Sequence, residues 1–359
     1  CITILAAIPP LMPKQFDTLR AMLDHGFDTV IDVRSPAEFA ADHMPGAINL
    51  PALSNDQRAE VGTIYKQVSA FKARKLGAAL VARNVADHVE GPLAEKDGSW
   101  QPLVYCWRGG QRSGSFTIIL QQIGWRADTV EGGYMTWRRL VNKALYDTPI
   151  TQRIILLDGN TGTAKTALLA KLAERGVQTI DLEGLAGHRG SLLGRTAGGQ
   201  PDQKGFESAL ATALANMDPT RPVILEAESS KIGRINLPKQ LWSAMIAAPR
   251  IMISAPISAR AAFLETAYAD VISDPIDLEK RLEPLRNIRG HAVVDGWIKL
   301  MNAGDFRALA AALMEQHYDA AYAKSRAVDE HEIIADLTSE TLDEAGQNTL
   351  VAAILKVIK

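Results

Sequence analysis

Short apolar runs alternate with longer amphipathic segments in the first part of the chain. Two of these runs, 28–33 (DTVIDV) and 102–106 (PLVYC), have the length of buried strands and are followed by turn-forming residues. Segments with helical spacing of apolar residues lie between and after them. This alternation is typical of an α/β layer with a mostly parallel sheet. We therefore predict a first α/β domain over residues 1–143.

A second alternation begins after 144–152 (ALYDTPITQ), a segment that contains a proline and breaks the pattern. It opens with the apolar run 153–158 (RIILLD), which is followed by a glycine-bearing loop and a helical segment. We interpret 144–152 as a linker and predict a second α/β domain over 153–270. Its further strand candidates are 178–184 (QTIDLEG), 222–230 (PVILEAESS) and 250–255 (RIMISA).

After about Tyr268 the pattern becomes helical almost throughout. Apolar residues recur every three to four positions in 306–325 and again in 349–358. The sequence therefore predicts a helical C-terminal region over 271–359, packed on the second domain.

Charge and cysteine content indicate the compartment of the protein but do not identify a binding partner. The 39 basic and 41 acidic side chains nearly cancel, so no global field indicates nucleic acid. Two cysteines in 359 residues suggest a reducing compartment, and we expect a cytoplasmic protein. The opening segment, CITILAAIPPLMP, lacks a basic start and is too short to span a bilayer, so we expect neither a signal peptide nor a membrane anchor.

The loop after the first domain's strand at 102–106 has the chemistry of a reactive thiol site. Cys106 is followed by Trp107, Arg108, two glycines, and Arg112 at the start of a serine-containing helical segment. Backbone N–H groups and cations lower the pKa of a thiol and make it nucleophilic. We therefore take Cys106, Arg108 and Arg112 as candidate catalytic residues, although a cysteine at a strand end is also common in a core.

Four segments in order resemble the landmarks of rhodanese domains. They are 32–39 (DVRSPAEF), 43–51 (HMPGAINLP), the cysteine loop, and 131–137 (EGGYMTW). The resemblance implies that Cys106 carries sulfur or selenium as a persulfide-like adduct and that Asp32 and Arg34 form a buried pair. The arginine lies six positions after the cysteine, one more than in common single-domain rhodaneses. This longer cradle resembles dual-specificity phosphatases and suits a phosphate-like ligand such as selenophosphate.

A second loop has the spacing of a P-loop. Residues 159–166 (GNTGTAKT) follow an apolar strand and precede a helix, which is the context in which loop amides cradle phosphates. Lys165 is expected to reach phosphate oxygens, and the Thr166 hydroxyl can hold Mg²⁺. Ala164 replaces the usual glycine and resists positive φ, so we expect a tighter or differently shaped cradle. The candidate phosphate-binding or diphosphate-binding residues are Gly159, Asn160, Thr161, Gly162, Thr163, Ala164, Lys165 and Thr166.

Polar residues near the second domain's strands extend this site. Glu226 and Glu228 end an apolar run, point the same way because side chains alternate along a strand, and are candidates for a metal ligand or a base. The glycine-rich segments 187–194 and 200–207 and the basic run after 230 suggest a binding surface. The candidate RNA or substrate contacts are Trp107, His188, Arg189, Gln200, Lys204, Lys231 and Arg234. Trp125 and Trp137 are expected in the core.

The chain resembles bacterial tRNA 2-selenouridine synthases over nearly its full length. The resemblance rests on the combination of a cysteine loop with a P-loop and on three further segments: 187–194 (GHRGSLLG), 226–238 (EAESSKIGRINLP) and 318–322 (YDAAY). The resemblance implies action on the anticodon wobble uridine of tRNA. In that family's reaction, the sulfur of 2-thiouridine is replaced by selenium from selenophosphate, after S-geranylation by geranyl diphosphate. The resemblance also implies that a selenophosphate-supplying enzyme is a partner and that Mg²⁺ assists.

Two other activities remain open at this point. A nucleotide-dependent kinase or ATPase with a rhodanese domain would use the same P-loop, although Ala164 counts against it. A C-x5-R phosphatase would use the same cysteine and Arg112 without tRNA.

Overall fold

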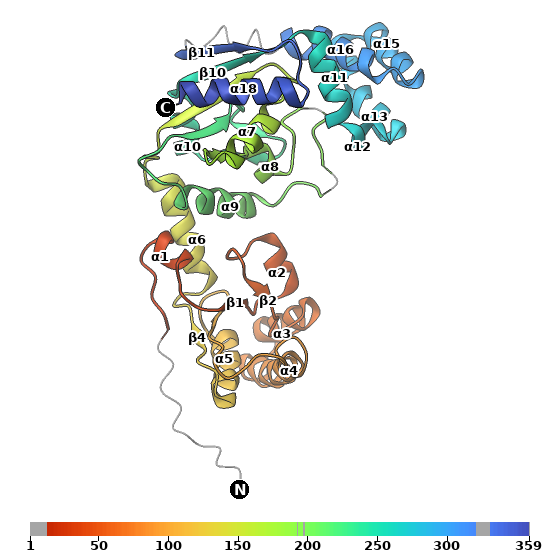
Figure 1. The fold of residues 1–359 in the computed structure, drawn as a ribbon. Helices are drawn as coiled ribbons and strands as arrows, with labels where there is room; N and C mark the ends of the chain where they lie inside the picture. The colour runs from red at the N-terminus through yellow and green to blue at the C-terminus, as the bar shows by residue number, and fades with distance from the viewer. Residues whose placement is uncertain (1–12, 192, 197, 321–330, 359) are drawn as a thin grey trace. The chain divides into compact units, whose positions relative to one another are not determined.

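The computed structural model describes residues 13–191, 193–196, 198–320 and 331–358. The chain folds into two compact units, and the predicted α/β class is confirmed for both (Figure 1). The first unit comprises Cys1–Pro149 and Pro201–Asn216, and the second comprises Ile150–Gln200 and Met217–Lys359. Cys1 and nearly all of the apolar opening segment lie outside the described residues, as does the second half of 318–322.

The first unit is built on a four-stranded parallel sheet with the order β2-β1-β3-β4. The two central strands, β1 and β3, correspond to the predicted apolar runs, and Asp32 at the end of β1 pairs in register with Tyr105 at the end of β3. The four strands are β1 (Thr29–Asp32), β2 (Ile48–Asn49), β3 (Pro102–Tyr105) and β4 (Asp128–Thr129).

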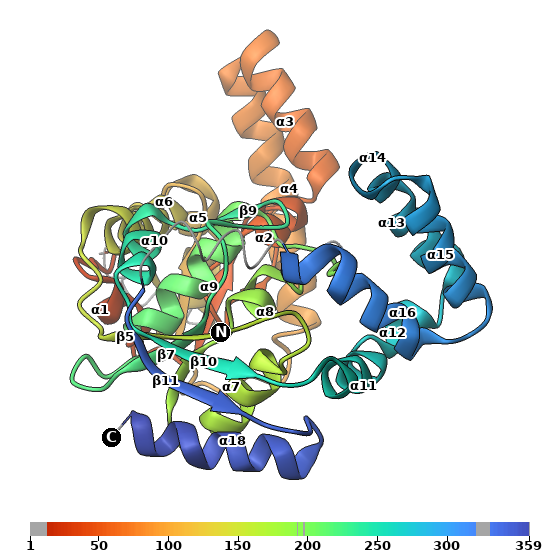
Figure 2. The same cartoon turned by 90° about the horizontal axis from the view of Figure 1, so that it is seen from above.

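Helices cover this sheet and bury its apolar side chains. Trp125 and Trp137 are buried, as the sequence predicted. Two long helices, α3 and α4, form a hairpin that projects from the sheet (Figure 2). The helices of the first unit are α1 (Leu19–Leu23), α2 (Pro36–Ala41), α3 (Asn55–Gln67), α4 (Ala70–Glu90), α5 (Gln111–Ile123), α6 (Tyr134–Asn142) with a π-helical continuation η1 (Lys143–Asp147), and α9 (Gln203–Ala215).

Helix α9 lies within the predicted range 153–270, yet it groups with the first unit. Buried polar contacts attach α9 to the first unit. The Trp137 indole donates to the Ser208 hydroxyl over 3.0 Å, and the Arg138 guanidinium pairs with Glu207 and with Asp42. These groups satisfy one another away from water, which accounts for the place of α9 beside α6.

The second unit contains a five-stranded parallel sheet with the order β11-β10-β5-β7-β6. Strands β5, β6, β7 and β10 begin at or within the predicted runs, and β5 at the centre leads directly into the P-loop. The strands are β5 (Ile154–Gly159), β6 (Gln178–Ile180), β7 (Val223–Glu226), β10 (Arg250–Ser254) and β11 (Ile333–Thr338), with a separate hairpin of β8 (Lys231–Ile232) and β9 (Ile235–Asn236).

Two helices far apart in sequence, α7 and α18, cover the same face of this sheet. Leu168 and Leu172 of α7 and Leu350 and Ile354 of α18 are buried against the strands in one apolar cluster. The helices of the P-loop part are α7 (Lys165–Glu174), α8 (Leu182–Ala186), α10 (Lys239–Ile246) and α18 (Glu344–Val357).

The C-terminal part is helical, as predicted, except for β11. This edge strand pairs in parallel with β10 and was not expected from the sequence. The other helices pack around the buried Trp297 in a separate apolar cluster. They are α11 (Ile257–Ala267), α12 (Ala269–Ile272), α13 (Pro275–Leu282), η2 (Glu283–Leu285), α14 (Arg286–Arg289), α15 (His291–Asn302), α16 (Phe306–Leu313) and η3 (Met314–Tyr318). Among the described residues, none of the helices is long and apolar enough to cross a membrane.

Candidate functional site

Cys106 lies directly after β3 and before α5, so the strand and the helix together fix its position. Its side chain is buried, and its Sγ accepts hydrogen bonds from the Gly110 N–H over 3.3 Å and from the Ser113 hydroxyl over 3.2 Å. Both donors come from the loop and the first turn of α5, where helix N–H groups favour negative charge.

The loop favours the ionised thiol. Burial by itself opposes ionisation of Cys106, but the hydrogen bonds from Ser113 and Gly110, together with the positive charge of Arg112, lower its pKa overall. A lower pKa increases the thiolate fraction near neutral pH, so the loop is suited to nucleophilic chemistry.

The glycine-rich segment before α6 lets the backbone approach this loop closely. Gly133 has φ of 56°, and a Cβ there would lie 2.3 Å from the carbonyl oxygen of Cys106 and 2.6 Å from the backbone nitrogen of Gly109. The Tyr134 N–H donates to that same carbonyl oxygen over 2.8 Å. Only glycine fits this contact without displacing the cysteine loop.

Arg34 and Asp32 form the buried ion pair that the resemblance implied. Their closest contact is 2.6 Å, and both side chains are almost completely buried. The guanidinium of Arg34 also lies over the Tyr134 ring, 3.8 Å from its centroid. This pair fixes the segment between β1 and α2 beneath the cysteine loop.

The two arginines of the loop differ in their surroundings. Arg112 donates to Glu38 over 3.1 Å and lies close enough to Cys106 to lower its pKa. The Arg108 side chain is exposed, and among the described residues it has no polar contact with the thiol. The structure therefore brings Arg112, but not Arg108, into the electrostatic environment of the sulfur.

Trp107 and Lys204 line one hollow beside the loop. Trp107 is half-buried, and its ring lies 5.1 Å from that of Tyr134. The hollow is also lined by Arg34, Glu38 and Arg58, so two aromatic rings stand among several cations. Such a surface is suited to a planar base with a phosphate.

The P-loop of the second unit joins β5 to α7 as predicted. Ala164 adopts the left-handed conformation with φ of 63°, and it is the one non-glycine with positive φ among the described residues. The backbone thus takes the shape that glycine would give, at a strain of about 1–2 kcal/mol. The Lys165 ammonium donates to the Gly159 carbonyl over 2.8 Å and lies within the loop.

A pair of carboxyl groups faces the P-loop. Glu183 accepts a hydrogen bond from the Thr166 hydroxyl over 3.1 Å, and it interacts with Glu228 through a carboxyl hydrogen bond. Burial and then the charge of Glu228 raise the pKa of Glu183 to about 8. The pKa of Glu228 is also raised by burial, with an opposing effect of Lys165. The two groups therefore share a proton near neutral pH.

Glu226 belongs to the same cluster but serves the backbone. It accepts the Glu183 N–H over 2.8 Å, and burial raises its pKa well above the usual range. The expectation that strand alternation aligns Glu226 with Glu228 is wrong, because β7 ends at Glu226. Glu228 is placed instead by a turn in which its N–H donates to the Glu226 carbonyl.

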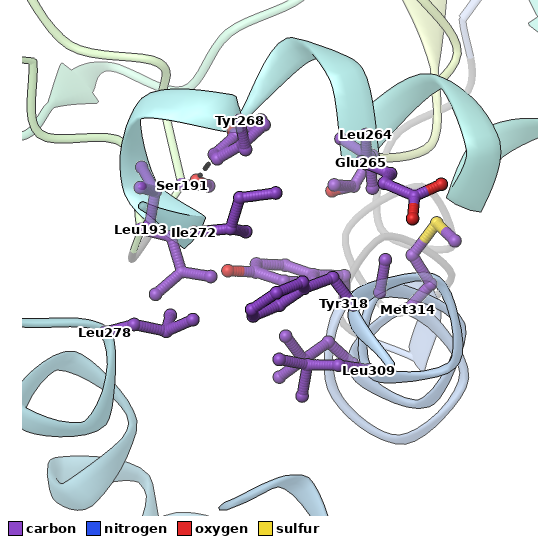
Figure 3. A pocket seen from close by; sticks show the side chains of 15 residues that line it. Ser191, Leu193, Leu264, Glu265, Tyr268, Ile272, Leu278, Leu309, Met314 and Tyr318 are labelled. Carbon is purple, nitrogen blue, oxygen red and sulfur yellow. Dashed lines mark hydrogen bonds between the residues drawn. The ribbon is translucent and has the colours of Figure 1, made fainter. Parts of the chain in front are cut away.

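Two cavities meet at the P-loop. The first is lined by residues 161–167 of the loop and α7, by Glu183, and by 187–191. The second is almost entirely apolar and lies among α11, α12, α13, α16 and η3 (Figure 3). Thr161, Ser191, Leu264, Tyr268 and Tyr318 line both cavities. The apolar cavity is completed by Leu193, Glu265, Val271, Ile272, Leu278, Phe306, Leu309, Ala310, Leu313 and Met314.

A buried arginine connects the P-loop to these helices. Arg260 of α11 donates to the Thr161 carbonyl over 3.3 Å and pairs with Asp319 over 2.6 Å. Asp319 belongs to the described part of the predicted motif 318–322, next to the cavity residue Tyr318. This connection holds the apolar cavity against the phosphate-binding loop.

The other predicted substrate residues lie in different surroundings. His188 and Arg189 line the P-loop cavity, and Arg189 pairs with Asp270 over 3.0 Å while its guanidinium lies over the Tyr268 ring. The side-chain amide of Gln200 bonds to the backbone at Ala186, Ile232 and Arg234.

Arg234 also donates to the Gln200 carbonyl, while Lys231 is exposed on β8. Gln200 and Arg234 therefore stabilise the β8–β9 hairpin.

Sequence reasoning missed Glu183, Arg260 and the apolar cavity. Glu183 lies inside the predicted strand 178–184, whereas the strand in the structure ends at Ile180, so the predicted bounds concealed a carboxylate just beyond the strand end. Arg260 lies outside any recognisable sequence motif. The cavity forms between helices whose apolar residues have the spacing of ordinary core positions.

Comparison with known proteins agrees with this arrangement. Residues 15–140 match the rhodanese-like domain family, and residues 152–280 match the family described as the tRNA 2-selenouridine synthase AAA domain. Three relatives are tRNA 2-selenouridine synthases from Hahella chejuensis, Aeromonas salmonicida and Shewanella loihica. They are 38%, 36% and 37% identical to 70%, 72% and 67% of this chain.

The aligned regions cover 66%, 68% and 64% of these relatives, so the chain spans about two thirds of their length. Both domain matches and the similarity to relatives over about 70% of the chain lead to one assignment: the chain belongs to the tRNA 2-selenouridine synthase family.

Proposed function

We propose that this protein replaces the sulfur of a 2-thiouridine in tRNA with selenium from selenophosphate, after attaching a geranyl group from geranyl diphosphate to that sulfur. The observation that carries the proposal is the junction of a phosphate-binding loop with an apolar cavity. A ligand that reached from the loop into this cavity would pair an anionic phosphate head with a hydrocarbon tail.

The lining of the apolar cavity favours a prenyl diphosphate over ATP. Leucine, valine, isoleucine, phenylalanine and methionine side chains form most of its wall. An adenine and a ribose would leave several polar atoms facing this wall without partners, which is costly. A geranyl chain has no such atoms and gains from burial of its apolar surface.

The residues at the P-loop suit the first chemical step. The thiouridine sulfur forms a bond to carbon 1 of the geranyl group, the carbon–oxygen bond breaks, and diphosphate leaves with the electron pair. The proton of the base passes to solvent. Lys165 and the loop N–H groups stabilise the charge that develops on the diphosphate.

The residues beside the P-loop are also compatible with a Mg²⁺ ion next to the diphosphate. Among the described residues there is no group of three or more His, Cys, Asp or Glu side chains that holds a metal by itself. Mg²⁺ needs only one or two carboxylates beside phosphate oxygens and water. Thr166, Glu183 and Glu228 would supply oxygen ligands, and the ion would add positive charge beside the leaving diphosphate.

Electron balance restricts what Cys106 does in the second step. If its sulfur took selenium directly from selenophosphate, selenium would lose two electrons; either phosphorus would accept them and leave as phosphite, or release of phosphate would need an external oxidant. Attack of the thiolate on phosphorus avoids this problem: a sulfur–phosphorus bond forms, the phosphorus–selenium bond breaks, and selenide leaves with the electron pair. The Gly110 N–H, the Ser113 hydroxyl and Arg112 favour the thiolate that this attack requires.

Selenide then completes the exchange at the base. It forms a bond to carbon 2 of the geranylated base, the carbon–sulfur bond breaks, and geranylthiol leaves with a proton. Water hydrolyses the cysteine–phosphate bond to phosphate and free thiol. The net reaction consumes selenophosphate and water without any oxidant.

Calorimetric titration tests whether the P-loop and the apolar cavity together bind a prenyl diphosphate. Wild type is expected to bind geranyl diphosphate more tightly than inorganic diphosphate or ATP. Leu309→Trp fills the apolar cavity and is expected to weaken geranyl diphosphate at least tenfold, while binding of inorganic diphosphate is unchanged and so reports an intact P-loop. Ile276→Trp, at an exposed position on α13, is the matched control.

Tight ATP binding with no preference for geranyl diphosphate would favour a nucleotide-dependent enzyme instead. In that case the apolar cavity would be an ordinary packing defect.

A further inference from the structure

The part of the α3–α4 hairpin around its tip carries a concentration of positive charge that the chain as a whole lacks, whereas the acidic residues Asp56, Glu60, Asp87 and Glu90 lie toward its base. Residues 61–86 contain five basic side chains and no acidic one, in a chain whose formal net charge is −2. Within the described residues, none of the five forms an ion pair, so their charge is available to a ligand. They are Lys66, Lys72, Arg74, Lys75 and Arg83.

Exposed apolar side chains lie among these cations at the tip of the hairpin. Tyr65, Val68 and Phe71 are 57%, 64% and 68% exposed, although Ala73, Val81 and Val85 of the same hairpin are buried. The helices therefore pack through a separate set of residues. The exposed aromatic rings are not needed for the core of the hairpin, and aromatic rings among cations are the composition of a surface on which bases stack.

Two adjoining hollows lie between this tip and the cysteine loop. The first runs along α3 past Tyr65 and Lys66 and reaches Arg112, the arginine of the cysteine loop. The second contains Trp107 and Tyr134. Arg58 lines both, so the two hollows adjoin along one side of α3.

The dimensions of this surface suit a short single strand. Helix α3 has 13 residues and is about 20 Å long at 1.5 Å per residue. A stacked strand advances about 3.4 Å per nucleotide, so about six nucleotides span this length. A strand that reaches the cysteine loop would therefore have its neighbouring nucleotides on α3 and on the tip.

We propose that the α3–α4 hairpin binds the single-stranded RNA that flanks the reacting nucleotide. Bases stack on Tyr65 and Phe71, and Lys66, Lys72 and Lys75 contact phosphates. This inference rests on the proposed function, because it takes tRNA as the substrate. RNA is favoured over an acidic protein because the aromatic rings stand among the cations and the hollow leads to a nucleophile.

Two double variants test the two kinds of contact. In Tyr65→Ala/Phe71→Ala, affinity for an unmodified anticodon stem-loop RNA, measured by fluorescence anisotropy, is expected to fall at least fivefold for each stacked base. In Lys72→Gln/Lys75→Gln, the slope of log affinity against log salt is expected to decrease by about 1.4. Lys280→Gln/Lys299→Gln, which removes two exposed charges from the second unit, is the matched control.

Polyglutamate serves as the competing probe for a protein-like acidic ligand. The aromatic variant is expected to lose RNA affinity and to keep its affinity for polyglutamate. Unchanged RNA affinity, or an equal loss for both probes, would overturn the hairpin proposal. An unchanged melting temperature establishes that each variant is folded.

The test separates this inference from the proposed function. If wild type modifies thiouridine RNA but the variants bind RNA normally, only the hairpin proposal fails. If the variants lose RNA affinity but wild type never modifies the base, the hairpin proposal stands and the proposed reaction fails.

Discussion

The cysteine loop and the P-loop are both anion cradles between a parallel strand and a helix, yet they hold titratable groups in opposite states. In the first, hydrogen bonds and Arg112 lower the pKa of Cys106 despite its burial. In the second, burial raises the pKa of Glu183, although Lys165 lies nearby. A loop between a strand and a helix thus favours an ionised thiol in one unit and a carboxyl pair that shares a proton in the other.

Replacement of Cys106 should have the largest effect, because it should stop selenium incorporation and leave geranylation intact. Cys106→Ser is expected to reduce selenium incorporation at least about 10³-fold, because an alcohol near neutral pH is not ionised as the thiol is. Geranylation should stay within about twofold of wild type, since Cys106 and the P-loop belong to different units. Nucleoside mass spectrometry measures both products, and loss of both would show that the two sites do not act separately.

Removal of the P-loop cation should have the converse effect. Lys165→Ala is expected to slow geranylation about 10²–10³-fold, because stabilisation of the departing diphosphate is lost. Lys171→Ala, further along α7, is the control. Selenium incorporation into RNA that is already geranylated should be unchanged, and an equal loss there would contradict the assignment of Lys165.

The close backbone contact at the cysteine loop predicts a large effect on stability. Gly133→Ala should lower the free energy of unfolding by about 2–4 kcal/mol, since the new Cβ meets the Cys106 carbonyl and the φ is positive. Gly114→Ala, where a Cβ meets nothing within 4 Å, is the matched control inside α5. Urea denaturation compares the two, and equal stabilities would show that the contact is not rigid.

The carboxyl pair of the P-loop site makes stability depend on pH. Because the pKa of Glu183 is raised from 4.5 to about 8, the folded protein retains a proton that the unfolded chain releases. The free energy of unfolding therefore decreases as pH rises through this window and levels off above about 8. Glu183→Gln should remove this contribution.

Thermal melting between pH 6 and 9 measures the effect. The melting temperature of Glu183→Gln should rise relative to wild type as pH increases, while Glu174→Gln, at an exposed position on α7, follows wild type. Parallel curves for all three proteins would show that Glu183 and Glu228 are not coupled in the folded state.

The smallest effect is expected at Ala164. Ala164→Gly relieves about 1–2 kcal/mol of left-handed strain. It loses a buried methyl group worth about 0.8 kcal/mol and adds about 0.5–1 kcal/mol of chain entropy in the unfolded state. The net change in stability should be within about 1 kcal/mol, whereas Ala164→Val should be clearly destabilising. A large gain for Ala164→Gly would mean that the strain is greater than the geometry indicates.

The sequence predicted the elements that have a local signal. Strands β1, β3, β5, β7 and β10 are continuous apolar runs, and both loops have fixed spacing after a strand. The buried pair Asp32 and Arg34 followed from resemblance and is confirmed. These features depend on residues that are neighbours in the chain.

The features that escaped prediction depend on long-range contacts. Strand β11 is a partly exposed edge strand, so its residues lack the continuous apolar run of the central strands. Helix α9 joins the first unit through Ser208 and Glu207, whose partners lie about 70 positions earlier. The apolar cavity requires several helices to meet, and its residues cannot be told from core residues by spacing alone.

Nucleoside analysis of a thiouridine RNA tests whether the protein exchanges sulfur for selenium through a geranylated intermediate. An RNA that contains 2-thiouridine is incubated with the protein and geranyl diphosphate, with and without selenophosphate, and its nucleosides are analysed by mass spectrometry. The account predicts geranylated thiouridine when selenophosphate is absent and 2-selenouridine when it is present. Unchanged thiouridine under both conditions, with consumption of ATP in a parallel reaction, would contradict it.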